Sequence, residues 1–194
     1  MTRAAFIDRD GVLNQLVGDE ESGGGDSPMR PDEVELIDGA IDALHRFAAA
    51  GFLLVGVSNQ PAAAKGRVPL SQLEAVQERV VELLAQVGVR FDDFRICHHH
   101  PRGVVAELAR PCDCRKPAPG MLLAAAERLG IDLAASWTIG DSDTDVAAGR
   151  AAGTHTLLIE NQASARKRVG GEDADGQVAD LAAAATFILA RDAR

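Results

Sequence analysis

Short apolar runs alternate along this chain with longer segments in which apolar residues recur at helical spacing. We expect strands at residues 4–7, 53–57, 94–96, 137–140 and 155–159. We expect helices at residues 39–50, 71–86, 121–129, 143–152 and 181–190, the second of them opening with a capping box formed by Ser71 and Glu74. This order predicts an α/β fold, in which helices cover both faces of a parallel sheet in three Rossmann-like layers.

Two stretches show neither the short apolar runs typical of strands nor the apolar spacing of helices. Residues 18–27 are rich in glycine and acidic residues, and residues 161–177 are charged and contain glycine. Both are predicted to be mobile loops, because segments of this composition offer little apolar surface to bury. The chain has 194 residues, a length that suits one hydrophobic core. We therefore expect a single domain over residues 1–194.

The overall charge narrows the classes of partner. A formal net charge of -9 describes a surface that repels polyanions, so broad nucleic-acid binding is not expected. No apolar run approaches the roughly 20 residues that span a bilayer, and charge follows the first methionine too soon for a signal peptide. These features predict a cytoplasmic protein that acts on a small molecule and does not bind membranes. The oligomeric state stays open, with a monomer favoured.

Polar side chains follow the ends of several predicted strands. Asp8 and Asp10 come directly after the first strand, Ser58 follows the second and Asp141 the fourth. Ligands of open α/β sheets bind at the carboxyl ends of strands, so we expect these side chains to converge there with Lys116. Carboxylates from two strands are ligands that Mg²⁺ prefers. Any one aspartate is explained as well by capping of a helix or turn, but the joint arrangement favours a metal site.

A second cluster combines soft ligands. All three cysteines lie in one part of the chain, in the runs Cys97-His98-His99-His100 and Cys112-Asp113-Cys114. Three thiolates and an imidazole suit tetrahedral Zn²⁺, whereas an odd number of cysteines speaks against a disulfide framework. The one-residue spacing within each pair is tighter than common zinc-finger spacing. Free thiols near the surface are therefore the alternative interpretation.

The run Asp8-Arg9-Asp10-Gly11-Val12-Leu13 resembles the first motif of the haloacid-dehalogenase-like phosphatases. Ser58 fits their second motif, Lys116 their third and residues 140–145 their fourth, so the resemblance covers residues 6–159. It implies that Asp8 is a nucleophile that forms an aspartyl-phosphate and that Asp10 is the general acid and base. Catalysis would then depend on positioning and on offsetting phosphoryl charge.

The same resemblance implies the remaining roles. Ser58, Asn59 and Lys116 would bind the phosphoryl group or hold its loop. Magnesium would be bound by Asp8, Asp10 and Asp141. Asp145 would either order water at the metal or simply occupy the first turn of a helix, where carboxylates are favoured.

The cysteine cluster refines the resemblance. A Cys-x-His-x12-Cys-x-Cys pattern that runs directly into Arg115 and Lys116 is similar to the zinc loop of the D-glycero-D-manno-heptose 1,7-bisphosphate phosphatases. The match implies a structural zinc, because four protein ligands fill the tetrahedron. The planar guanidinium of Arg115 suits a second phosphate or a carboxylate, and pairing with a nearby aspartate explains it equally well. By this match the zinc ligands are Cys97, His99, Cys112 and Cys114, with His98 or His100 as the alternative imidazole ligand if the register differs.

Some features depart from that family. Pro61 stands in the second motif where an N–H is usual, and residues 18–31 replace a compact segment that normally carries an aromatic residue. Histidinol-phosphate phosphatases share a similar zinc loop, but theirs is usually shorter between the two ligand pairs, which favours the heptose branch. The alternatives are another small-molecule phosphatase of this kind, a phosphotransferase with the same residues, or an inactive zinc-containing module that binds a sugar phosphate or a protein.

Overall fold

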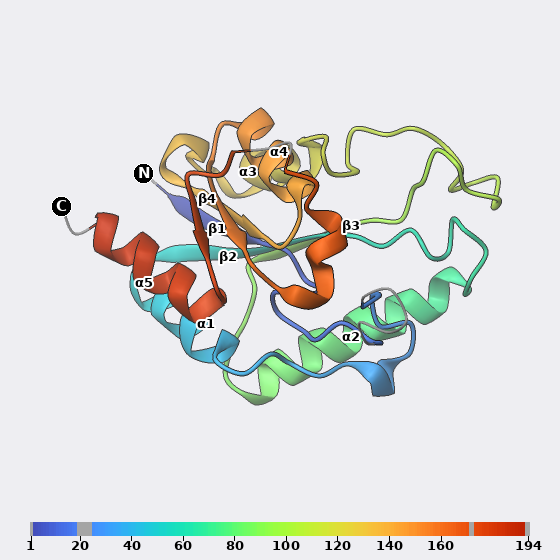
Figure 1. Cartoon of the computed structure of the whole chain (residues 1–194), viewed down its shortest axis with the longest axis horizontal. Helices are drawn as coiled ribbons and strands as arrows, with labels where there is room; N and C mark the ends of the chain where they lie inside the picture. Colours follow the sequence, from blue (N-terminus) through green and yellow to red (C-terminus); the bar gives the residue numbers. More distant parts are fainter. Residues whose placement is uncertain (1, 19–24, 171–172, 193–194) are drawn as a thin grey trace.

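The computed structural model describes residues 2–18, 25–170 and 173–192, which contain a six-stranded sheet (Figure 1). In chain order the strands are β1 (Arg3–Ile7), β2 (Phe52–Asn59), β3 (Asp93–Cys97), β4 (Trp137–Gly140), β5 (His155–Ile159) and β6 (Gly176–Val178). All neighbours pair in parallel, in the order β3-β2-β1-β4-β5-β6. Because β1 lies between β2 and β4, the strand order reverses beside it, and that is where α/β sheets form a ligand crevice.

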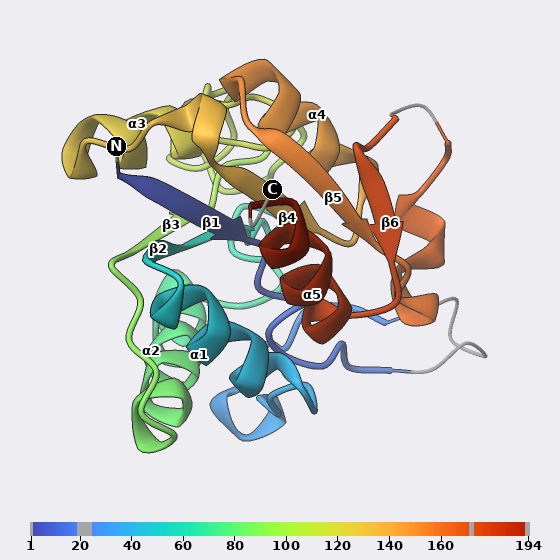
Figure 2. The same ribbon diagram turned by 90° about the vertical axis from the view of Figure 1, so that its left-hand side faces the viewer.

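Helices cover both faces of the sheet (Figure 2). One face carries α1 (Ala40–Ala49), α2 (Leu70–Gln86) and α5 (Leu181–Asp192), and the other carries α3 (Gly120–Leu129) and α4 (Asp143–Ala152). Successive side chains of a strand point to opposite faces, so Ala5 and Ile7 of β1 pack into the first core while Ala4 and Phe6 pack into the second. The predicted three-layer α/β fold is confirmed.

The five predicted strands and five predicted helices are all present, with shifts at their ends. The capping box predicted at Ser71 is wrong. Helix α2 begins at Leu70, and Pro69 takes the N-cap position without a side-chain cap. Proline is tolerated there because the first N–H groups of a helix have no partner within it.

The second predicted loop is ordered into secondary structure. The described part of residues 161–177, which leaves out 171–172, contains the 3-10 helix η3 (Gln162–Lys167) and the start of strand β6, which pairs with β5 from Leu157↔Gly176 onward. Strand β6 has only three residues, so it carries no apolar run that a sequence pattern detects. Of the first predicted loop, residues 19–24 lie outside the described residues.

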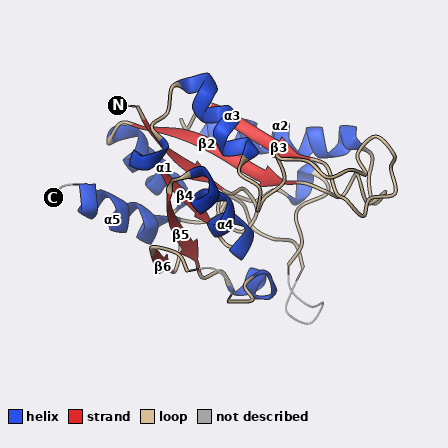
Figure 3. Cartoon of the chain, turned by 90° about the horizontal axis from the view of Figure 1, so that it is seen from above, coloured by secondary structure: helices blue, strands red, loops and turns tan. Residues whose placement is uncertain are grey.

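The loops at the carboxyl ends of the strands shape the open side of the sheet (Figure 3). Within the described residues, the segment between β1 and α1 holds only one short 3-10 helix, η1 (Pro31–Glu33), and no inserted cap domain. The remaining 3-10 helix in the described residues, η2 (Leu133–Ala135), leads into β4. Among the residues described, no helix has the length and apolar character needed to cross a membrane.

Candidate active site

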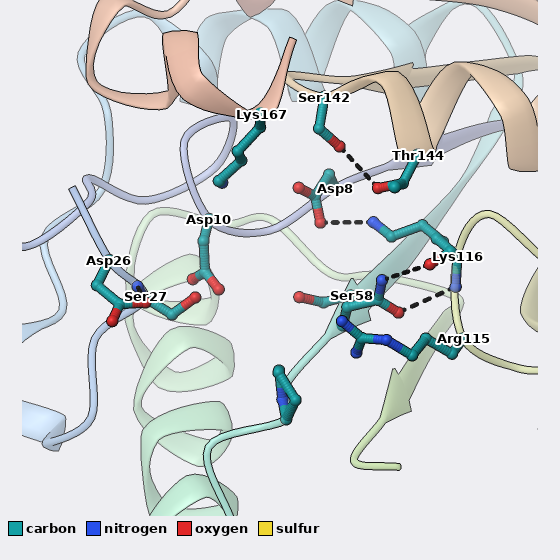
Figure 4. A pocket seen from close by; sticks show the side chains of 12 residues that line it. Asp8, Asp10, Asp26, Ser27, Ser58, Arg115, Lys116, Ser142, Thr144 and Lys167 are labelled. Carbon is teal, nitrogen blue, oxygen red and sulfur yellow. Dashed lines mark hydrogen bonds and ion pairs between the residues drawn. The ribbon is translucent and has the colours of Figure 1, made fainter. Parts of the chain in front are cut away.

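Asp8 lies at the centre of a cavity at the carboxyl end of β1 (Figure 4). Its backbone N–H donates to the carbonyl of Ile139 at 2.9 Å, which continues the pairing of β1 with β4 beyond the strand end. Its carboxylate accepts a hydrogen bond from Lys116 Nζ at 2.8 Å. The side chain is buried but lines the cavity, so a ligand in the cavity can reach its carboxylate.

Lys116 reaches this centre from the loop after β3. Its ammonium donates to the carbonyl of Val57 at 2.7 Å and lies 2.5 Å from Asp145 Oδ1. Burial alone lowers the pKa of Lys116, but the two neighbouring carboxylates raise it above its ordinary value, so the side chain stays charged. Asn59 holds the loop, because its amide exchanges hydrogen bonds with the backbone N–H and carbonyl of Lys116 at 3.1 and 3.0 Å.

Three carboxylates form one buried group. Oxygens of Asp8, Asp141 and Asp145 lie within 4.8 Å of one another. Gly11 allows this closeness, since a Cβ on its backbone would meet Asp141 Oδ2 at 2.2 Å. Burial raises the pKa of Asp8 to about 7, because Lys116 offsets only part of the desolvation, and burial raises that of Asp141 as well. Such a group is costly without a cation, and its hard oxygen donors fit Mg²⁺.

Asp145 belongs to this group, and the carboxylate of Asp10 does not. Asp145 also completes a capping box with Ser142 at the start of α4, which is the helix position expected for it, and it contacts Lys116. Its ordering of water at a metal stays a prediction. A Cβ at Gly140 would meet Asp145 Cγ at 2.2 Å, which explains why glycine precedes Asp141 here. Side-chain ligation of Mg²⁺ by Asp10 stays a prediction.

Asp10 is held in a separate polar network. The buried guanidinium of Arg9 donates to both of its oxygens, at 2.9 and 3.1 Å, and Asn14 Nδ2 donates at 3.0 Å. The side-chain amide of Gln60 donates both to Asp10 and, at 2.9 Å, to Ser58 Oγ. Burial raises the pKa of Asp10, but the Arg9 charge and these hydrogen bonds outweigh it and lower the pKa to about 2.

The cavity beside these groups has a volume of about 290 Å³, and Asp141 and Asp145 are not among the residues that line it. It brings together the predicted residues Asp8, Asp10, Ser58, Asn59, Arg115 and Lys116. It also contains residues that the sequence did not single out as part of a site: Asp26, Ser27, Ser142, Thr144 and Lys167. Arg9 and Gln60 were missed too, because nothing in the sequence pattern distinguishes a buried network residue from an ordinary loop residue.

The cysteine cluster lies beside this cavity. The thiol of Cys114 is 3.1 Å from that of Cys97 and 3.3 Å from that of Cys112, and His99 Nδ1 is 3.4 Å from Cys114 Sγ. All three cysteines are free thiols. Zn–S bonds of about 2.3 Å place sulfurs of a tetrahedral site about 3.8 Å apart, so this donor set fits Zn²⁺ with small adjustments. His98 instead faces the carbonyl of Gln60, at 3.3 Å.

Known proteins share this sequence and architecture. Residues 113–184 match the family model described as HAD-hydrolase-like. The chain is 41% identical over 156 residues to the D-glycero-beta-D-manno-heptose-1,7-bisphosphate 7-phosphatase of Escherichia coli (strain K12), covering 80% of this chain and 78% of that protein. It is 38% identical over 188 residues to the protein of the same name from Yersinia pestis, covering 97% and 96%. The chain belongs to the family of D-glycero-beta-D-manno-heptose-1,7-bisphosphate 7-phosphatases.

A solved structure agrees with the heptose bisphosphate phosphatase assignment. The crystal structure of D,D-heptose 1,7-bisphosphate phosphatase from B. bronchiseptica complexed with magnesium and phosphate superposes with a TM-score of 0.79. That protein is 31% identical, and the match covers 98% of this chain and 99% of that one. The resemblance to heptose bisphosphate phosphatases inferred from the motifs is therefore confirmed, and so is the haloacid-dehalogenase-like fold.

Proposed function

We propose that this protein is a Mg²⁺-dependent phosphatase that removes the 7-phosphate of D-glycero-D-manno-heptose 1,7-bisphosphate. The observation that carries the proposal is the buried Asp8 carboxylate, which lines the cavity, accepts a hydrogen bond from Lys116 and is grouped with Asp141 and Asp145. Membership in the heptose bisphosphate phosphatase family supports the choice of substrate.

Magnesium would be bound by Asp8 and Asp141, with Asp145 beside them and Asp10 as a further ligand expected from the sequence. The cation would offset charge on the phosphoryl oxygens during transfer. Lys116 supplies positive charge at the same place. Ser58, which lines the cavity, would donate its hydroxyl to a phosphoryl oxygen. This arrangement of a cation, a lysine and a hydroxyl fits phosphoryl transfer, in which catalysis depends mainly on positioning and electrostatics.

In the first step a carboxylate oxygen of Asp8 attacks phosphorus, and the bond from phosphorus to the sugar oxygen breaks. The leaving oxygen takes a proton from Asp10. Asp10 is ionised in the protein without ligands, since its pKa is about 2. A phosphate dianion beside it raises that pKa through like-charge repulsion, so the proton enters together with the substrate.

In the second step water attacks the phosphorus of the aspartyl-phosphate on Asp8. Asp10, now ionised, accepts a proton from that water, and the bond between Asp8 and phosphorus breaks. Inorganic phosphate leaves and the Asp8 carboxylate is regenerated. Arg9, Asn14 and Gln60 keep Asp10 in one place throughout both steps, since they hold both of its oxygens.

Zinc would have a structural role. Cys97, His99, Cys112 and Cys114 would fill its tetrahedron and fix the chain just before Arg115 and Lys116. The same loop holds Gln60, whose backbone N–H donates to the carbonyl of Cys97 at 2.7 Å. The cluster would thus position both the phosphoryl-binding lysine and a hydrogen-bond donor of Asp10. Thiols of this kind fit a reducing compartment, so a cytoplasmic location is part of the proposal.

Arg115 would bind the second phosphate. Its side chain lines the cavity next to Lys116, and its Nη1 donates to the His99 carbonyl at 3.4 Å. A planar guanidinium suits bidentate contact with a phosphate. In the absence of an inserted cap domain in the described residues, this contact would select a bisphosphate over a monophosphate.

Phosphate release by the purified protein with Mg²⁺ tests the proposal. We expect faster release from heptose 1,7-bisphosphate than from histidinol phosphate, and a loss of at least about 10⁴-fold in kcat in Asp8→Asn. Release from histidinol phosphate alone would keep the mechanism and overturn the substrate. No release from any phosphate ester would contradict the enzymatic proposal and favour a binding module.

A further inference from the structure

Lys167 is a second lysine in the wall of the cavity. It is the last residue of η3, and its side chain is directed toward the space between Asp8 and Asp10 (Figure 4). Its ammonium lies 3.3 and 3.5 Å from the two oxygens of Asp141. The side chain is 31% exposed, so a ligand in the cavity can reach it.

The segment that carries Lys167 is tied to both aspartate loops. Asn161 Nδ2 donates to the carbonyl of Gly11 at 2.9 Å, next to the Asp8 loop. Ser164 Oγ and Arg168 Nη1 donate to the backbone carbonyl of Asp141 at 3.4 and 3.3 Å. These bonds come from a segment of little apolar content, and they hold Lys167 at a defined place rather than on a freely moving loop.

The two lysines of the cavity differ in how their charge is compensated. Lys116 is shared between Asp8 and Asp145, whereas the carboxylate within reach of the Lys167 ammonium is that of Asp141. Burial lowers the pKa of Lys167, but Asp141, Asp8 and Asp10 raise it above the ordinary value. A cation bound by Asp141 would neutralise that carboxylate and free the ammonium, whose flexible stem and three donors suit a phosphoryl group.

We propose that Lys167 is a second phosphoryl-binding lysine, which leaves Asp141 when Mg²⁺ binds and donates to an oxygen of the phosphoryl group on Asp8. The inference rests on the proposed function and names a further residue of that site. It gives the phosphoryl group a cation from η3 in addition to Lys116, so that charge is offset from two sides. Charge-assisted hydrogen bonds of this kind strengthen as negative charge collects on the oxygens.

Binding of inorganic phosphate, measured by calorimetry at saturating Mg²⁺, tests the inference without turnover. We expect Lys167→Met to raise the Kd of phosphate at least 10-fold and Lys167→Arg to restore part of the loss. Arg79→Met removes one positive charge from the exposed face of α2 and is the matched control, expected to bind phosphate like the wild type. Phosphate binding by Lys167→Met within twofold of the wild type would overturn the inference.

A Mg²⁺ titration of the same variants separates ligand binding from support of the metal site. We expect Lys167→Met to bind Mg²⁺ at least as tightly as the wild type, because a competing cation is removed from Asp141. Loss of Mg²⁺ affinity of more than 10-fold would show that the lysine supports Asp141 instead, and would overturn the inference. If the wild type hydrolyses no phosphate ester but Lys167→Met still loses phosphate binding, the proposed function fails and the lysine assignment stands.

Discussion

Asp8 and Asp10 lie two residues apart in the same loop, yet their surroundings shift their pKa values in opposite directions. Around Asp8, burial and two further carboxylates dominate, and the pKa rises to about 7. Around Asp10, the Arg9 guanidinium and hydrogen bonds from neighbouring amides overcome burial, and the pKa falls to about 2. Two identical side chains thus receive different properties from the groups that surround them.

This order of pKa values is the reverse of what the proposed reaction needs, since the nucleophile must be ionised and the acid must hold a proton. The ligands supply the difference. A cation next to Asp8 lowers the pKa of Asp8, and a phosphate dianion next to Asp10 raises the pKa of Asp10. The comparison therefore teaches that the proposed reaction needs a metal to lower the pKa of Asp8 and a substrate to raise that of Asp10.

After Asp8→Asn, replacing Asp10 by asparagine gives the largest expected effect on kcat. We expect kcat to fall about 10²–10⁴-fold, because proton transfer to and from the reacting oxygens is lost. Affinity for Mg²⁺ should fall less than in Asp141→Asn, because the Asp10 carboxylate lies outside the group formed by Asp8, Asp141 and Asp145. Kinetics and a Mg²⁺ titration measure both, with Asp141→Asn as the control that loses metal affinity. An equal loss of metal affinity in both variants would place Asp10 among the ligands.

Replacing Arg9 by methionine removes the main charge that lowers the pKa of Asp10. The Arg9–Asp10 pair is buried, so we expect a loss of about 3–5 kcal/mol in the free energy of unfolding. Chemical denaturation measures it. Arg79→Met, which breaks an exposed pair with Glu82, is the control and should cost less than about 1 kcal/mol. Similar losses in the two variants would mean that the buried network adds little to stability.

The pH dependence of stability tests the environment of Asp8. In Mg²⁺-free protein the folded pKa of Asp8 lies above its unfolded value of 3.8, so the folded state binds more protons between about pH 4 and 7. The contribution of Asp8 to stability is therefore lost as pH rises through that window, by a few kcal/mol at most. Asp8→Asn should flatten this dependence in denaturation curves at pH 5 and pH 8. An unchanged slope in the variant would contradict the raised pKa.

A change in the cysteine cluster should have the smallest effect on activity, because the cluster acts on the site only through Gln60 and the Lys116 loop. We expect Cys112→Ser to lower kcat/KM about 10-fold, as changes in supporting residues commonly do. Elemental analysis should find zinc in the wild type and less of it in the variant. Unchanged activity after complete loss of zinc would show that the cluster does not position the site.

The parallel sheet and the main residues of the site could be predicted together, because the apolar runs that mark the strands also mark the strand ends where site residues lie. Asp8, Ser58 and Asp141 each follow an apolar run, and parallel strands bring their carboxyl ends to the same edge of the sheet. Family motifs then assigned roles to those positions. Lys116 was expected at the same edge although its own segment does not follow a predicted strand directly, and the resemblance gave it a role.

Residues that act through tertiary contacts could not be predicted in this way. Arg9 resembles an ordinary charged loop residue in the sequence but is buried against Asp10, and Gln60 is identified only by its two hydrogen-bond partners. Lys167 lies in a stretch whose composition predicted a mobile loop. This stretch is held in place by hydrogen bonds to the backbone of Gly11 and Asp141, which are more than 20 residues away in sequence. Amino-acid composition does not reveal such long-range hydrogen bonds.

The stereochemical course at phosphorus tests the central claim that Asp8 forms a covalent intermediate. Heptose 1-phosphate 7-thiophosphate, made chiral at the 7-phosphorus with an oxygen isotope, would be hydrolysed with Mg²⁺ in water of a different isotope. Attack by Asp8 followed by attack by water inverts phosphorus twice, so the account predicts net retention in the released thiophosphate. Net inversion would mean direct attack by water and would contradict the account.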